Sequence, residues 1–170
     1  LTPEALEKAI TPKTKALILP YPNNPTGGIL GRPELEKLRE VILRHDLIVI
    51  SDEIYAELTY NGQGHVSIAS LPDMKERTIY LNGFSKAFAM TGWRVGYTVT
   101  HPDLVKKLSQ ITGQATGNIC SVSQKAAVAA LTGPYDCVES MRQAFQKRRD
   151  MAWKEIASWS NVVCPKPEGA

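Results

Sequence analysis

The sequence lacks the features that mark several large classes of protein. No apolar run approaches the ~18 residues that a membrane-spanning helix needs, and no basic-then-apolar signal pattern opens the chain, so no membrane association is expected. The 20 lysine and arginine residues exceed the 17 aspartate and glutamate residues by only three, which argues against binding to nucleic acid. An internal repeat and a P-loop phosphate motif are also absent.

Cysteine and histidine are scarce and have no metal-type spacing, so no metal site is expected. An odd number of cysteines is typical of reduced thiols and predicts a cytoplasmic protein, not a disulfide framework. The three cysteines are Cys120, Cys137 and Cys164. The three histidines, which we interpret as surface or loop residues, are His45, His65 and His101.

What is present is close to an average globular composition. Of the 170 residues, 43% are apolar and 22% are charged, and a chain of this length can bury a substantial core. The chain starts at Leu1 without an initiator methionine and stops just after a strand-like run at 161–164. We expect a piece of a longer polypeptide, the alternative being a complete domain with trimmed ends.

Strand-like and helix-like segments alternate in the first half of the chain. Short apolar runs predict strands at 15–19, 47–50 and 78–81, and proline-led amphipathic segments predict helices over 2–10 and 33–42. The apolar residues of 47–50 are consecutive, which is typical of a parallel strand covered on both faces. The pattern therefore predicts an α/β fold with three layers, α/β/α, around a mainly parallel sheet.

The second half is predicted to be mostly helical. A strand at 94–99 follows the preceding strand after about eleven residues, which is short for a parallel crossover, so this strand is expected to be antiparallel or to follow an irregular crossover. Helices are then expected from Pro102, with an apolar face that includes Leu104 and Leu108, from a cap at Ser123, and from Pro134.

Unusual polar residues follow three of the predicted strands. They form the segments Asn-Asn-Pro-Thr-Gly at 23–27, Ser-Asp-Glu-Ile-Tyr at 51–55 and Asn-Gly-Phe-Ser-Lys at 82–86. Ligands of open α/β sheets bind beyond the carboxyl ends of the strands. Each segment alone is an ordinary turn, but all three at one edge of a sheet indicate a functional site.

The residue types at this edge suit one ligand in particular. The amine of Lys86 can form a Schiff base with a carbonyl, and Arg94 can hold an anion. The carboxylate of Asp52 can keep a ring nitrogen protonated, and Tyr55 and Asn24 can hydrogen-bond a ring oxygen. A carbonyl, a ring nitrogen, a phenolic oxygen and a phosphate are the groups of pyridoxal 5′-phosphate.

These motifs carry a family resemblance that covers essentially the whole chain. The segments at 23–27, 51–55 and 85–97, in this order and spacing, resemble the class I and II aminotransferases, which are fold-type-I pyridoxal-phosphate enzymes. The resemblance implies that 1–133 is part of a cofactor-binding large domain and 134–160 a long connecting helix. Residues 161–170 would then be the truncated start of a small C-terminal domain.

The resemblance also implies roles for individual residues. Lys86 would form the Schiff base with pyridoxal phosphate and later move the substrate proton, and Asp52 would pair with the pyridinium nitrogen. Tyr55 and Asn24 would hydrogen-bond the phenolic oxygen, and Arg94 would bind the phosphate. The expected reaction moves an amino group between an amino acid and a 2-oxo acid, in a homodimer.

The sequence departs from the family at one position and leaves other functions open. Many members carry a hydroxyl residue three places before the lysine, where this chain has Gly83, and Ser85 is a candidate to compensate. The family's substrate-carboxylate arginine and phosphate loop lie outside the chain, so the isolated piece is expected to be poorly active. The alternatives are a carbon–sulfur lyase, an aminocyclopropane-type synthase, a ligand-sensing module, or an inert structural fragment.

Overall fold

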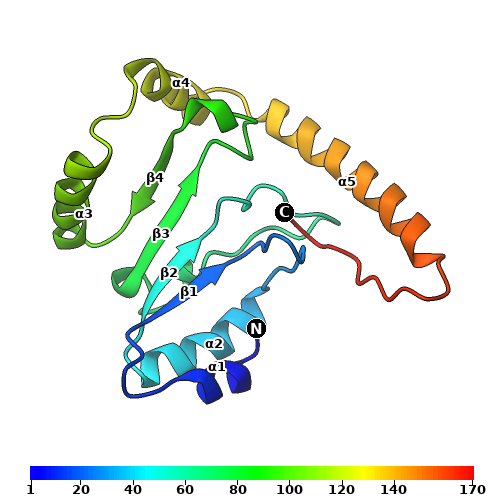
Figure 1. Cartoon of the computed structure of the whole chain (residues 1–170), viewed down its shortest axis with the longest axis horizontal. Helices are drawn as coiled ribbons and strands as arrows, with labels where there is room; N and C mark the ends of the chain where they lie inside the picture. The colour runs from blue at the N-terminus through cyan, green and yellow to red at the C-terminus, as the bar shows by residue number, and fades with distance from the viewer.

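The computed structural model describes residues 1–170 and is built around one four-stranded sheet (Figure 1). The strands are β1 (Ala16–Pro20), β2 (Ile48–Asp52), β3 (Thr78–Gly83) and β4 (Gly96–Val99), and they lie side by side in this order. The first three are parallel, whereas β4 is antiparallel to β3. The α/β fold, the mainly parallel sheet and the antiparallel direction of the last strand are confirmed.

Five α-helices and three short 3₁₀ turns accompany the sheet. The helices are α1 (Pro3–Ala9), α2 (Arg32–Arg44), α3 (Pro102–Ala115), α4 (Ser121–Thr132) and α5 (Asp136–Ala157), and the turns are η1 (Ile68–Ser70), η2 (Lys75–Arg77) and η3 (Thr91–Trp93). None of the helices combines the length and the hydrophobicity that crossing a bilayer requires.

The start of α1 follows from its sequence. The hydroxyl of Thr2 accepts a hydrogen bond from the backbone N–H of Ala5 at 3.2 Å, and Pro3 occupies the first helical position, where no N–H is needed. Glu4 in the first turn adds a negative charge that favours the helix N-terminus.

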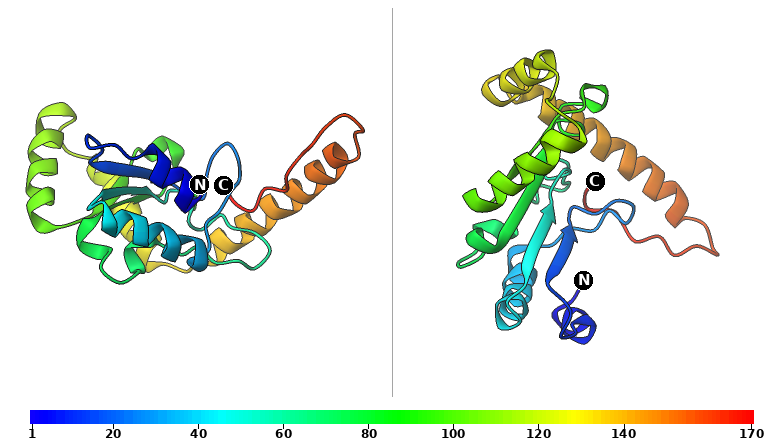
Figure 2. Two further views of the ribbon diagram at one scale, coloured as in Figure 1. Left: turned by 90° about the horizontal axis from the view of Figure 1, so that it is seen from below. Right: turned by 60° about the vertical axis from the view of Figure 1, so that its left-hand side comes forward.

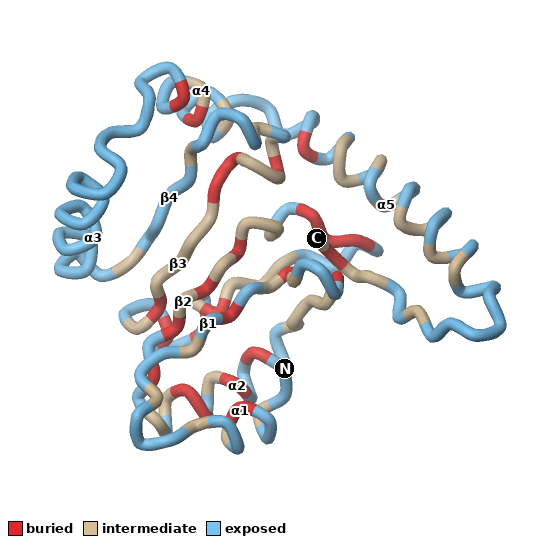
Figure 3. The backbone as a smooth tube through the Cα atoms, in the orientation of Figure 1, coloured by how far each residue is buried: buried red, intermediate tan, exposed pale blue.

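The core lies between α1, α2, the η1–η2 segment and one face of the sheet (Figure 3). The side chains of α2 that face the strands are spaced three and four residues apart, as an amphipathic helix requires. The core comprises Leu6, Leu19, Leu35, Leu38, Val41, Ile42, Leu47, Val49, Ile68, Leu71 and Met74.

The opposite face of the same strands is open. Leu19 and Val49 are buried, yet their neighbours Ile18 and Ile48 are 67% and 37% exposed. Because side chains alternate between the two faces of a strand, this difference separates a packed face from an uncovered one. The prediction that the strand at 47–50 is covered on both faces is therefore wrong for residues 1–170, where helices pack on one face only.

The helices of the second half lie away from this core. Helix α3 and helix α4 flank β4, and α5 projects from the sheet before the chain turns back toward the strand ends (Figure 2). Helix α3 has no buried residue, and its predicted apolar face, which includes Leu104 and Leu108, is exposed.

Two local predictions of the second half are wrong. Ser123 does not cap α4, which begins at Ser121 with Cys120 as its N-cap. The buried hydroxyl of Ser123 instead donates to the carbonyl of Trp93 at 2.8 Å. The run at 161–164 is not a strand. It lies beside α5, and the carbonyl of Cys164 accepts from the indole N–H of Trp153 at 3.0 Å.

The long helix predicted over 134–160 is present as α5, which begins after the N-cap residue Tyr135 and ends at Ala157. The division of the chain into a large domain, a connecting helix and the start of a small domain stays a prediction.

Candidate active site

All five residues predicted for the site lie at one edge of the sheet. Asn24 follows β1, Asp52 ends β2, and Tyr55 and Lys86 come three residues after the ends of β2 and β3. Because β4 runs antiparallel to β3, its first residues meet the last residues of β3, and Arg94 therefore lies at the same edge. The sheet topology brings together side chains up to 70 positions apart in the sequence.

Asn24, Tyr55 and Lys86 form a contiguous group. The amide nitrogen of Asn24 donates to the hydroxyl oxygen of Tyr55 at 2.9 Å, and the ammonium nitrogen of Lys86 lies 5.3 Å from the centre of the Tyr55 ring. The second distance is within the range of a cation–π contact. Because the Tyr55 oxygen accepts from Asn24, the Tyr55 proton remains free to be donated to a ligand.

Asp52 and Arg94 have partners of their own at this edge. One oxygen of the half-buried Asp52 carboxylate accepts from the backbone N–H of Ile54 at 3.2 Å. The exposed guanidinium of Arg94 donates to the carbonyl of Thr91 at 2.8 Å. Arg94 also has a φ of 49°, a left-handed conformation that is uncommon for a residue with a side chain and occurs often at ligand sites.

A cavity of about 500 Å³ opens beside Lys86. One side of it is lined by Tyr55 and Ser85, and the other by side chains of α5, including Met141, Phe145 and Arg148. The sequence indicated only a packing stripe for Met141 and Phe145, because nothing local marks a helix that lies more than 50 positions after Lys86 as part of its surroundings. Ala170 also reaches this cavity.

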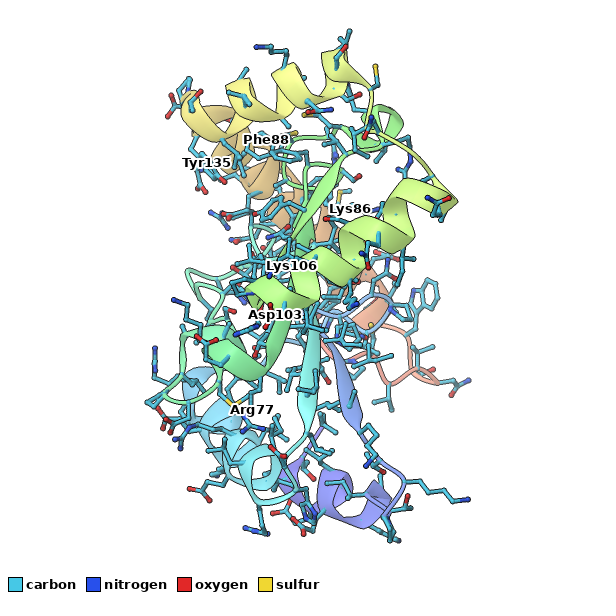
Figure 4. The ribbon with its side chains drawn as sticks, turned by 90° about the vertical axis from the view of Figure 1, so that its left-hand side faces the viewer. Arg77, Lys86, Phe88, Asp103, Lys106 and Tyr135 are labelled. Carbon is cyan, nitrogen blue, oxygen red and sulfur yellow. The ribbon has the colours of Figure 1, made fainter.

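Aromatic side chains hold the segment that carries Lys86. The ring of Phe88 meets the ring of Tyr135 edge-on at 5.5 Å, and both lie at the end of the molecule where α4 and α5 meet (Figure 4). Phe84 is buried, and the centre of its ring lies 5.8 Å from the centre of the Phe88 ring. Partial burial raises the pKa of Tyr135 above its ordinary value. Lys86 thus lies between two anchored aromatic residues.

The close approach of β3 and β4 explains the unusual glycine at position 83. A Cβ atom at Gly83 would lie 3.0 Å from the Cα of Gly96 and 3.2 Å from the carbonyl of Val95, so a larger residue needs the strands to move apart. Ser85, two residues later in the same segment, lines the Lys86 cavity.

The loop that carries Asn24 is closed by its own side chains and by the end of the chain. The side chain of Asn23 accepts from the hydroxyl of Thr26 at 2.7 Å, and Gly27 turns the chain with a φ of 69°. The backbone N–H groups of Glu168 and Gly169 both donate to the carbonyl of Gly27, at 2.7 and 2.9 Å. The predicted start of the small domain therefore contacts the loop beside Asn24.

Sequence reasoning missed one buried carboxylate of this region. Glu53, next to Asp52, is 1% exposed and contacts the ring of His65 at 2.5 Å. His65 lies in a loop, which agrees with its interpretation as a surface or loop residue, and its side chain is only 16% exposed. A histidine that pairs with a carboxylate twelve residues away leaves no periodic signal in the sequence.

Comparisons with known proteins show the family to which the chain is similar. The family model described as aminotransferase class I and II matches residues 1–170. The aspartate aminotransferase of Geobacillus stearothermophilus is 46% identical over the whole chain, which covers 44% of that protein.

Two solved structures are similar over the whole chain. The aspartate aminotransferase of Rhizobium meliloti has a TM-score of 0.97 at 40% identity, and the chain covers 43% of it. The aromatic aminotransferase of Pyrococcus horikoshii has a TM-score of 0.95 at 40% identity, with 46% of that chain covered. The chain thus spans less than half the length of these relatives.

Proposed function

This chain belongs to the class I and II aminotransferase family, and from that premise we propose that the full-length protein is a pyridoxal-phosphate-dependent aminotransferase. The single observation that carries the proposal is the contact group of Asn24, Tyr55 and Lys86 at the carboxyl edge of the sheet. It sets a primary amine beside a phenol whose proton is free.

The donor set at this edge fits the chemical groups of pyridoxal phosphate. An amine, a phenol, a carboxylate and a guanidinium suit its carbonyl, its phenolic oxygen, its ring nitrogen and its phosphate respectively. These groups belong to Lys86, Tyr55, Asp52 and Arg94, which lie in three neighbouring places of one sheet edge: around the end of β2, in the segment after β3 and just before the start of β4. The fit rests on the chemistry of the residues and on their shared position.

Each residue then has one task in amino-group transfer. Bound pyridoxal phosphate supplies an electron-withdrawing ring that acidifies the α-carbon of an amino acid. Lys86 would hold the cofactor covalently and, once the substrate amine has displaced it, would carry the proton that leaves the α-carbon, a general acid–base contribution of about 10²–10⁴-fold in rate. Asp52 would keep the ring nitrogen protonated, and Tyr55, whose hydroxyl accepts from Asn24, would donate a hydrogen bond to the ring oxygen.

We propose an amino acid and a 2-oxo acid as the substrates, because the similar proteins are named as aspartate and aromatic aminotransferases. We further propose a homodimer, for which the exposed apolar side chains of α3 and α4 offer a surface, and a cytoplasmic location, with which the three free cysteines agree. Light scattering of the full-length protein measures its oligomeric state, and fractionation of cells determines its location.

Covalent trapping tests the proposal. The full-length protein is incubated with pyridoxal phosphate and reduced with borohydride, and peptide mapping is expected to find the cofactor on Lys86. Lys86→Ala is expected to abolish the label, whereas the matched control Lys106→Ala, which alters an exposed lysine of α3, keeps it. Label on another lysine would contradict the assignment of Lys86.

Product analysis then tests the reaction. Incubation with an amino acid and a 2-oxo acid is expected to yield the exchanged pair. Release of pyruvate from cysteine conjugates without such exchange would instead identify a carbon–sulfur lyase.

A further inference from the structure

Glu53 carries a buried carboxylate with three side-chain partners. One oxygen accepts from the hydroxyls of Ser51 at 2.8 Å and Ser67 at 2.7 Å, and the other contacts the Nε2 atom of His65 at 2.5 Å. A buried carboxylate is costly unless charged or polar partners compensate it, and here both oxygens are engaged. The pattern indicates that these hydrogen bonds hold the Glu53 side chain in one specific position.

The three partners come from the two ends of one loop. Ser51 lies in β2, whereas His65 and Ser67 lie just before η1, so the chain leaves the sheet after Glu53 and returns to it at the same carboxylate. The backbone N–H of Glu53 also donates to the carbonyl of Leu81 in β3 at 2.9 Å. Glu53 therefore closes the loop over 54–66 on the end of the parallel strands.

This loop begins with the residues that the proposed site uses. Glu53 stands directly after Asp52, and Tyr55 is the second residue of the loop. Successive side chains of an extended chain point to opposite faces of the sheet. The carboxylate of Glu53 is therefore buried on the packed face, and that of Asp52 points to the open face. Movement at Glu53 would shift Asp52 and Tyr55 together.

We infer that Glu53 is a positioning residue: by binding Ser51, Ser67 and His65 at once, it fixes Tyr55 where its hydroxyl accepts from the Asn24 amide and its ring contacts Lys86. This inference rests on the proposed function, since Tyr55 matters there as a donor to the bound cofactor. Glu53 itself acts only through the residues on either side of it.

The test compares two glutamates of the same segment in the full-length protein. Glu53→Gln keeps the size of the side chain and removes its charge, and the matched control Glu57→Gln makes the same change at an exposed position two residues beyond Tyr55. His65→Ala removes one partner and leaves both serines, which provides a milder variant if Glu53→Gln fails to fold.

Two measurements are needed. In the cofactor-free protein, hydrogen exchange of the backbone over 54–66 is expected to accelerate about 10- to 100-fold in Glu53→Gln, because a hydrogen-bonded charge is lost from the base of the loop. In the cofactor-bound protein, the proton equilibrium read from the pH titration of the cofactor's absorption band is expected to move about tenfold toward the protonated form, because the donor Tyr55 is displaced.

The outcomes separate the inference from the proposed function. Faster exchange together with the shifted titration in Glu53→Gln, and neither in Glu57→Gln, supports a positioning role. Faster exchange with an unchanged titration shows a merely structural role and overturns the inference, as does exchange equal to that of Glu57→Gln. If the unmodified protein does not take up the cofactor, the proposed function fails and the positioning role fails with it, while exchange still decides whether Glu53 closes the loop.

Discussion

The two faces of the sheet differ in what they contribute. On one face, Leu19 and Val49 are buried against α1 and α2 and belong to an eleven-residue core. On the other face, the neighbouring Ile18 and Ile48 are exposed, and the same side of β2 ends in the half-buried Asp52. One face therefore provides the packing that stabilises the fold, and the other ends in a side chain of the proposed site.

The contrast continues into two adjacent carboxylates. Glu53 is fully compensated by hydrogen bonds within the packed face, whereas Asp52 keeps an oxygen available at the open edge. A carboxylate that must meet a ligand cannot be fully engaged by the protein, because its remaining hydrogen-bonding capacity is what the ligand uses. The alternation of a single strand thus assigns structural and chemical tasks to neighbouring residues.

The largest expected effect concerns the packing difference between the faces. Leu38→Ala, at a fully buried position of α2, should lower the free energy of unfolding of the full-length protein by about 2–5 kcal/mol through the cavity that it leaves. Ile18→Ala on the open face should cost under about 1 kcal/mol if that face stays exposed. Urea titration measures both, and equal losses would show that the open face is covered in the full-length protein.

The second prediction concerns the chemical role of the open edge. Asp52→Asn should lower kcat by about 10²–10³-fold, the range seen when one preorganised electrostatic partner is removed from an active site, with the urea midpoint unchanged. Asp103→Asn on α3, where the carboxylate is exposed, serves as the control. A loss of stability that parallels the loss of rate would assign Asp52 to the packing side of the comparison.

The third prediction tests how firmly the open edge is held. Both Gly27 and Gly62 have positive φ angles, 69° and 72°, but a Cβ atom at Gly27 would overlap Pro167, whereas nothing lies within 4 Å of one at Gly62. Gly62→Ala should cost about 1 kcal/mol from backbone strain alone, and Gly27→Ala about 1–3 kcal/mol with additional loosening of the Asn24 loop. Thermal unfolding of the two variants checks the order, and equal effects would mean that residues 167–170 do not brace this loop.

The smallest expected effect lies at the margin of the packed face. Tyr80 lies in register with Ser51, and burial raises its pKa to about 12 from an ordinary value of 10. Because the folded state holds the Tyr80 proton more tightly than the unfolded state, its contribution to stability is complete below pH 10 and disappears as the pH rises through 12. Tyr80→Phe should therefore flatten the fall of Tm between about pH 10 and 12. An unchanged dependence of Tm on pH would mean that the Tyr80 hydroxyl is open to water.

Much of the fold could be predicted because its signals are local. The proline-led helix starts, the amphipathic spacing of α2 and the short apolar strands each depend on a few neighbouring residues. The short connection before β4 also indicated its antiparallel direction. The prediction that Ser123 caps a helix is wrong because a serine hydroxyl can either cap a helix or donate to a distant carbonyl. Only the position of α4 beside Trp93 decides between these two roles.

The order of the elements and the residue types that follow each strand can be read from the chain alone. These properties depend on backbone propensity and on the alternation of apolar and polar side chains, which act over a few residues. Folding is what makes Asn24 donate to Tyr55, places Lys86 opposite α5, and lets Glu53 bind both ends of a loop. Such contacts join segments that are far apart in the chain, and their geometry exists only once the strands have paired in register.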